Sequence, residues 1–125
     1  MSSRETLSLD VLGESSQQLS IQESEFLETG SAELYELISA SIEGRLSRVS
    51  QMLNQGMDVN QRDEAGRTAL MEASAFGRFG VVVRLINAGA DINLRDNQGI
   101  TSLMLATMEG RERVVKLLID KKADV

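Results

Sequence analysis

The chain repeats itself at a period of 33 residues, and no other feature constrains its fold as strongly. Two consecutive stretches, which begin at Asp63 and Asp96, align without a gap. Further residue types recur at matched positions: Gly66 and Gly99, Thr68 and Thr101, Leu70 and Leu103, Ala73 and Ala106, Gly77 and Gly110, Leu85 and Leu118. A fainter copy lies upstream, at Leu37, Ala40, Gly44, Val49, Leu53, Gly56 and Asp58. Because one such unit cannot bury its apolar side alone, the repetition predicts a stack of similar units.

The residue spacing within one unit predicts two short helices and an extended loop. Thr68 is expected to cap the first helix at its N-terminus. Gly77 is expected to end that helix, where a left-handed residue is needed. A second helix is predicted from about residue 79 to residue 87, closed by Gly89. Residues 90–99 are polar and are expected to form an extended excursion with a turn at its tip.

With these motifs the chain resembles the ankyrin repeats over about residues 31–125. The family pattern is roughly D-x-x-G-x-T-P-L-x-x-A, then G-x-x-x-V-V-x-x-L-L, then G-A-D-V-N. The middle unit matches it at Asp63, Gly66, Thr68, Leu70, Ala73, Gly77, Val82, Leu85, Gly89, Ala90, Asp91, Ile92 and Asn93. The resemblance implies an all-α fold: an ankyrin-repeat solenoid of stacked helix-turn-helix units with β-hairpin-like loops.

The chain departs from the family pattern at a few positions. Met71 and Met104 stand where the family has a histidine, so we expect core contacts in place of its hydrogen bonds. Lys122 stands where Gly56 and Gly89 stand in the other units. If that position keeps a positive φ, lysine costs about 1 kcal/mol there relative to glycine.

The expected organisation is an N-terminal arm followed by one repeat domain. Residues 1–29 are acidic and rich in Ser and Gln, and we predict that they are mostly disordered. Residues 30–125 are the ankyrin-repeat domain. Residues 30–62 form a more polar N-terminal capping repeat, 63–95 a full repeat, and 96–125 a repeat truncated at its end.

The last repeat has no following unit that would cover Leu117, Leu118 and Ile119. Two interpretations stay open: the sequence is a fragment of a longer array, or it is a complete short protein with a ragged or dimeric C-terminal face. Because so few repeats are close to the minimum for stability, we predict low thermal stability or self-association through these three residues.

The amino-acid composition excludes several common kinds of catalytic site. The chain has no cysteine and no histidine, which excludes thiolate nucleophiles, zinc–thiolate sites and the commonest general base. Asp58, Asp91 and Asp124 recur at the repeat period, as do Asp63 and Asp96, and all of them are expected to hydrogen-bond local backbone in turns. We therefore predict that the chain is not an enzyme, and we assign no catalytic, cofactor-binding or metal-binding residue.

Charge is concentrated in the first part of the chain. Residues 1–36 contain eight acidic residues and one basic residue, whereas the remainder contains twelve basic and eleven acidic residues. An acidic arm without a basic stripe elsewhere argues against nucleic-acid binding. No apolar run suggests a signal peptide or a membrane span. We expect a cytoplasmic protein, with a nuclear location or secretion as an effector left open.

The resemblance places binding on the concave face, which hairpin tips and first helices form in this family. Carried over residue by residue, the candidate partner-binding residues are Arg62, Glu64, Arg67, Phe76, Arg95, Asn97, Gln98, Ile100, Leu105, Met108 and Glu109. The apolar members are expected to be exposed, although packing of Ile100 on a neighbouring hairpin fits equally well. Arginine and aromatic residues dominate interface energetics, and the arginines predict a partner protein with acidic character.

The expected function is therefore a protein–protein interaction module that binds through this face. The alternative is a non-catalytic regulatory or targeting segment of a larger multidomain protein or effector whose activity lies beyond Val125. Fold alone does not separate the two.

Overall fold

The computed structural model describes residues 31–124, so the arm predicted at residues 1–29 lies outside the described residues. Residues 31–124 form helices and loops without a strand, and Leu34–Val125 make up one compact unit. The helices are α3 (Ser31–Glu43), α4 (Leu46–Asn54), α5 (Ala69–Ala75), α6 (Phe79–Asn87), α7 (Ser102–Met108) and α8 (Glu112–Asp120). The predicted all-α class is confirmed for this part of the chain.

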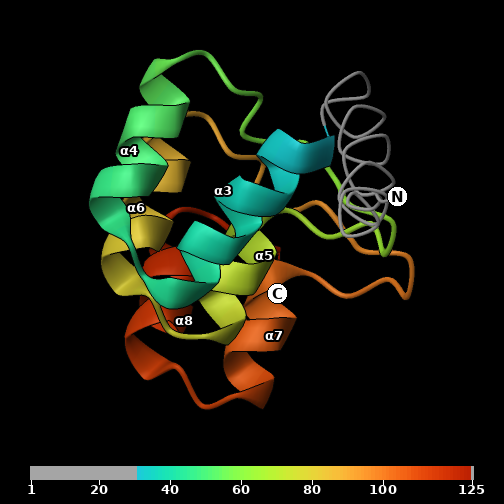
Figure 1. The fold of residues 1–125 in the computed structure, drawn as a ribbon. Helices are drawn as coiled ribbons and strands as arrows, with labels where there is room; N and C mark the ends of the chain where they lie inside the picture. The colour runs from blue at the N-terminus through green and yellow to red at the C-terminus, as the bar shows by residue number, and fades with distance from the viewer. Residues whose placement is uncertain (1–30, 125) are drawn as a thin grey trace, which may run out of the picture. The chain divides into compact units, whose positions relative to one another are not determined.

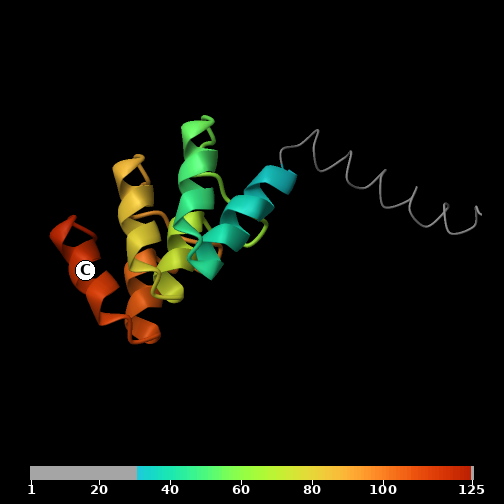
Figure 2. The same cartoon turned by 60° about the vertical axis from the view of Figure 1, so that its left-hand side comes forward.

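The helices are arranged as three antiparallel pairs that stack along one direction (Figures 1 and 2). α5 packs on α7, α4 on α6, and α6 on α8, while α5–α6 and α7–α8 are the pairs within one repeat. The turned view in Figure 2 shows α4, α6 and α8 side by side as the second helices of successive pairs. α5 and α7 begin 33 residues apart, as do α6 and α8, so the sequence period is also the structural period.

The predicted start and end signals act as expected in the middle repeat. The Thr68 side chain caps α5 by accepting a hydrogen bond from the Met71 N–H at 3.3 Å. Gly77 has φ 70°, and the following Arg78 N–H bonds back to the Ala73 carbonyl at 2.9 Å. The second helix covers the predicted residues, Phe79–Asn87.

Leucines at one repeated position form the centre of the core. Leu37 and Leu70 are fully buried, and Leu103 in the last repeat is 9% exposed. Leu118 is also fully buried in the core cluster, so it is not among the parts of α8 that lack a covering repeat. Ile119, on the other side of α8, is 48% exposed.

The two methionines that replace the family's histidine have different surroundings. Met71 is 1% exposed and packs with Ala75 and Leu105, as the core prediction required. Met104 is 42% exposed, which contradicts the same prediction. The difference arises because Leu105 of the next repeat covers Met71, whereas nothing in residues 31–124 covers Met104 in that way. Lys122 has φ 71°, so the position does keep the positive φ at which lysine is less favourable than glycine.

Candidate functional site

Two loop tips, at residues 61–67 and 94–100, lie next to each other where the helix pairs are joined. An aspartate organises each of them. Asp63 Oδ1 accepts hydrogen bonds from the Ala65 and Arg67 backbone N–H groups, each at 2.9 Å. Asp96 Oδ1 accepts them from Gln98 at 2.8 Å and Ile100 at 2.9 Å. These carboxylates therefore hold the turns together, as the sequence predicted for the recurring aspartates.

Asn97 joins the second tip to the first. Its backbone N–H donates to the Ala65 carbonyl at 2.9 Å, and its side-chain amide donates to the Glu64 carbonyl at 2.8 Å. Gly66 makes this approach possible because it has φ 79° and a Cβ there would lie 2.9 Å from the Asn97 backbone nitrogen. The two tips consequently form one cross-linked surface.

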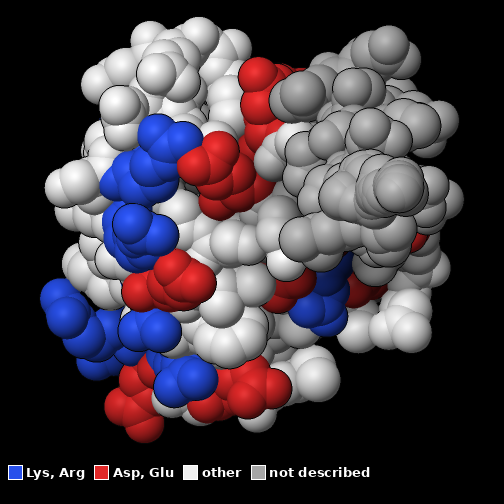
Figure 3. Space-filling view, in the orientation of Figure 1, with Lys and Arg blue, Asp and Glu red and all other residues white. Residues whose placement is uncertain are grey.

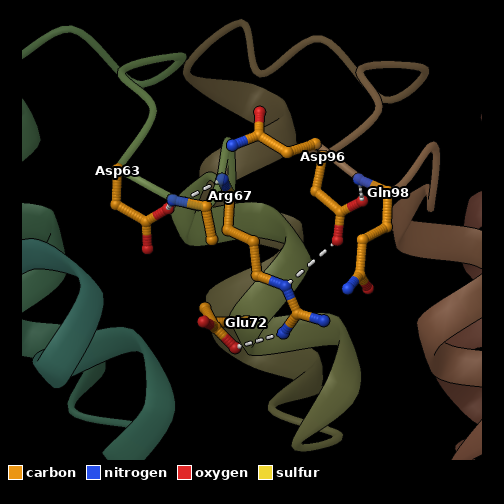
Figure 4. A pocket seen from close by; sticks show the side chains of 7 residues that line it. Asp63, Arg67, Glu72, Asp96 and Gln98 are labelled. Atoms are coloured by element: carbon orange, nitrogen blue, oxygen red, sulfur yellow. Dashed lines mark hydrogen bonds and ion pairs between the residues drawn. The ribbon is translucent and has the colours of Figure 1, made fainter.

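Arg67 is held inside this surface by two carboxylates (Figure 4). Its Nε lies 3.3 Å from Asp96 Oδ2, and its Nη1 lies 3.2 Å from Glu72 Oε1. The Arg67 side chain is 26% exposed and that of Asp96 only 3%. Sequence reasoning placed Arg67 among the free partner contacts and missed this ion-paired arrangement. Asp96 is brought to Arg67 only by stacking of the repeats, whereas Glu72 belongs to the same repeat as Arg67.

The hydrogen bonds that Asp96 accepts lower the pKa of its carboxyl from the ordinary value of 3.8. The backbone hydrogen bond from Ile100 contributes most to the lowered pKa, and burial opposes it without outweighing it. The Gln98 N–H and the Arg67 guanidinium add to the lowering. Asp96 is therefore a charged, structural carboxylate at neutral pH.

An open polar hollow of about 520 Å³ surrounds Arg67 between the two tips (Figure 4). It is lined by Asp63, Ala65, Arg67, Glu72, Asp96, Asn97 and Gln98. Its walls carry three carboxylates and one guanidinium, and the guanidinium is already paired with two of them. The hollow therefore offers polar groups in fixed positions, and its one guanidinium is not free to pair with a ligand.

The other two arginines of the predicted row are exposed but anchored to loop backbone. The Arg62 guanidinium donates to the Arg95 carbonyl across the repeat boundary. Arg95 donates from Nη1 to the Gly99 carbonyl at 2.9 Å. Both side chains therefore have fixed positions and still face solvent.

The predicted apolar contacts divide into exposed and buried residues. Phe76 is 43% exposed and Met108 is 67% exposed, each at the end of a first helix. Leu105 is only 4% exposed because it packs on Met71 and Ala75, so its expected exposure was wrong. Ile100 is partly buried against the same cluster, which agrees with the interpretation that it packs on its neighbours.

The polar candidates are accessible. Glu64, Asn97, Gln98 and Glu109 are all exposed. Figure 3 shows basic and acidic side chains interleaved down the left side of the view, without one large patch of a single sign. The described residues contain no group of three or more His, Cys, Asp or Glu side chains that could hold a metal ion. Among the described helices, none has the length and apolar character needed to cross a membrane.

Comparison with known proteins identifies the repeat. A family model described as ankyrin repeats (3 copies) matches residues 37–125. A search of curated proteins finds no matching relative. Ankyrin repeats are generally protein–protein interaction modules and are typically non-catalytic. The stacked helix pairs, the 33-residue period and this match agree, and the chain belongs to the ankyrin-repeat family.

Proposed function

We propose that this chain binds a partner protein through the face formed by the two loop tips and the C-terminal ends of α5 and α7. The observation that carries the proposal is the exposed aromatic side chain of Phe76, which is 43% exposed inside an otherwise well-packed repeat. The same repeat position holds Glu43 and Glu109 in the other units, so the repeat architecture itself does not require an apolar residue there. Exposed aromatic side chains are the type that most often anchors a protein interface.

Preorganisation of the tips supports this proposal. The Asn97 bonds to Ala65 and Glu64, and the Arg62 bond to Arg95, fix the two tips relative to each other. A surface whose side chains and loops are already ordered loses little conformational entropy when it binds. The tips can therefore present polar contacts in fixed positions.

The charge on this face suggests the chemistry of the partner. Arg67 is occupied by Asp96 and Glu72, so the loop-tip arginines that present accessible guanidinium groups are Arg62 and Arg95. We propose that a carboxylate of the partner contacts these two arginines while an apolar side chain packs on Phe76. The chain would act by binding and not by catalysis.

Site-specific photo-crosslinking tests the proposed face. A photoreactive amino acid is placed at Phe76, and in a matched variant at Lys116, which is exposed on α8. We expect the Phe76 variant to capture a defined partner that the Lys116 variant does not capture. Equal capture of this partner from both positions would reject the proposed face.

A titration of the captured partner tests the charge component separately. We expect the double variant Arg62→Glu and Arg95→Glu to bind about tenfold more weakly or worse, because each rejected carboxylate contact costs on the order of 1 kcal/mol. Lys116→Glu makes half of that charge change at a position outside this face and should leave affinity unchanged. Undiminished affinity of the double variant would reject the proposal that the partner contributes a carboxylate. It would not affect the proposal that the partner binds this face.

A further inference from the structure

Charge is divided between the first and the second helices of the stack. The segments that contain the first helices hold five glutamates and no basic residue: 31–43, 68–76 and 101–109. The segments that contain α4 and α6, with the turns before them, hold four arginines and no acidic residue: 44–57 and 77–90. In the last repeat, residues 110–119 hold three basic residues, and Glu112 is the acidic one. Positive charge therefore gathers on the second helices and on the turns that precede them.

An arginine stands at the N-terminal end of every second helix. Arg45, Arg78 and Arg111 are the N-cap residues of α4, α6 and α8. The interhelix turns that contain them follow one another along the lower edge of the stack in Figure 2. Arg78 donates from Nε to the Ile42 carbonyl of the preceding repeat at 2.7 Å, and Arg111 donates in the same way to the Ala75 carbonyl at 3.0 Å. Their side chains therefore have equivalent positions at successive repeat boundaries.

The guanidinium groups of Arg78 and Arg111 are held in place without being neutralised. Each donates its Nε–H to a backbone carbonyl, which has no net charge. Within residues 31–124 neither forms an ion pair, and their Nη atoms have no hydrogen-bond partner. The terminal N–H groups of a guanidinium form a fork that matches a carboxylate. Both arginines therefore keep the donors needed for a bidentate pair with an anion.

The residue that precedes each turn glycine decides how much of this charge is balanced. In the first repeat it is Glu43, whose carboxylate lies 3.6 Å from Arg45. In the middle repeat the same position holds Phe76. The side chain of Arg111 lies over this middle turn, since a Cβ at Gly77 would be 2.8 Å from it. The turn that Arg111 covers consequently offers it no carboxylate.

A further arginine lies over the same turn. Arg113 is exposed on α8, and its Cζ is 4.0 Å from the centre of the Phe79 ring. An aromatic face attracts a guanidinium but does not cancel its charge. Arg78, Arg111 and Arg113, here called the turn arginines, therefore present positive charge in fixed positions at the interhelix turns.

The spacing of the turn arginines indicates which anion they fit. Packed helices lie about 8–10 Å apart, and Arg78 and Arg111 occupy the same position in successive repeats. An extended chain advances about 3.3 Å per residue, so carboxylates three residues apart are separated by about 10 Å. The phosphates of a nucleic acid follow one another more closely, and they would also meet Glu43 and Glu109, which are exposed at the ends of α3 and α7. The spacing favours an acidic peptide.

We propose that the turn arginines bind an extended acidic segment of a partner protein, in which the carboxylates are three residues apart. Arg78 binds one carboxylate and Arg111 the next, each through its terminal N–H groups. Arg113 adds positive charge beside Arg111. Bidentate arginine–carboxylate pairs supply geometric specificity as well as energy. The proposal does not depend on binding at the loop tips, whose arginines belong to a different set of contacts.

Fluorescence anisotropy with two synthetic peptides tests the proposal on the full chain. One labelled peptide carries three aspartates, each separated from the next by a Gly-Ser pair. The other has the same composition, but its aspartates are consecutive. At low salt we expect the spaced peptide to bind about fivefold more tightly or better, because its carboxylates can reach successive arginines. Equal affinity for the two peptides would overturn the proposal, as would the absence of binding.

Arginine variants locate the binding site of the spaced peptide. Arg78→Gln and Arg113→Gln should each weaken binding by about fivefold, because each removes one cation from the turns. The matched control is Arg84→Gln, which removes the same charge from α6. The Arg84 guanidinium bonds to Ser50 and Asn54 of α4, so this variant should bind as the unmodified chain does. Thermal unfolding checks that each variant is folded, and Arg113→Gln decides the test if Arg78→Gln is not.

Three results with the spaced peptide would overturn the proposal. Equal weakening by Arg84→Gln would mean that the peptide responds to net charge alone. Weaker binding in Arg62→Gln or Arg95→Gln, with the turn variants unaffected, would place the peptide at the loop tips. Displacement of the peptide by an equal concentration of single-stranded oligothymidylate would mean that the turns fit closely spaced phosphates.

Discussion

The first and the third repeat share one backbone unit but terminate the stack in opposite ways. At the outer side of the first repeat, Glu36 and Arg48 form an ion pair across α3 and α4. At the outer side of the third repeat, Met104 and Ile119 are 42% and 48% exposed. The comparison shows that a few side chains at matched positions decide whether a repeat closes the stack or leaves it open to a neighbour.

Neighbouring residues of α8 differ in burial because only one side of this helix is covered by other helices of the stack. Leu118 is fully buried although it lies in the last repeat, whereas the adjacent Ile119 is half exposed. α8 packs on α7 of its own repeat and on α6 of the preceding repeat, and Leu118 belongs to the hydrophobic core cluster of the stack. The third repeat is therefore well packed on its inner side, and only its outer face lacks a neighbour in the described residues.

The largest expected difference between the two ends is the cost of truncating their core leucines. Leu37→Ala should lower the free energy of unfolding by about 3–4 kcal/mol, because the fully buried Leu37 would leave a closed cavity. Leu103→Ala should cost nearer to about 2 kcal/mol, because the third repeat can relax toward its open side. Urea unfolding curves of both variants check this. A larger loss for Leu103→Ala would break the comparison.

The loop tips should show the next largest effect. Gly66→Ala should cost about 2 kcal/mol or more, since it combines an unfavourable positive φ with a clash against the Asn97 backbone. Gly99→Ala has nearly the same φ, at 81°, but meets nothing within 4 Å, and should cost about 1 kcal/mol. Thermal unfolding of the two variants measures the difference. Equal destabilisation would mean that contact between the tips adds nothing to the backbone strain.

The Asp96 carboxyl should make the interface between the second and third repeats sensitive to acid. Its pKa is lower in the folded chain than its ordinary value of 3.8, so the charged form stabilises the fold above that pH. This stabilisation is lost as the pH falls below about 3.8 toward the lowered pKa. Asp96→Asn should therefore be less stable at pH 7, and it should lose less further stability than the unmodified chain as the pH falls below about 3.8. Parallel pH profiles of the two proteins would contradict the role assigned to Asp96.

The smallest predicted effect is a gain at the end of the third repeat. Lys122 has φ 71° where the other repeats have Gly56 and Gly89. Lys122→Gly should stabilise the chain by about 0.5–1 kcal/mol, which corresponds to a rise in Tm of a few degrees for a domain of this size. Calorimetry of the variant checks the gain. A lower Tm would show that lysine contributes a contact that exceeds its backbone strain.

Much of the fold could be predicted from local signals. The Thr68 cap, the Gly77 turn and the second helix at Phe79–Asn87 all follow from residue types at fixed spacing, and the structure confirms them. These features depend on interactions within a few residues, so a single repeat of the sequence contains the information for them.

The candidate site was predicted less completely, because several of its contacts form across repeats. Arg67 was expected to face a partner, but it pairs with Asp96, which is 29 residues away in the chain. Leu105 was expected to be exposed, but it covers Met71 of the preceding repeat. A comparison of each position with its counterparts would have been needed to find these contacts, together with the packing geometry of neighbouring repeats.

The sequence by itself determined the repeating unit, its two helices and its turns. Those properties arise from backbone conformation and short-range hydrogen bonds, which the residue types at each repeat position select. Only the tertiary structure decided that Leu118 is buried, that Met104 is exposed and that Arg67 is neutralised. Burial and charge pairing depend on which repeat lies on each side, and that is a property of the whole stack.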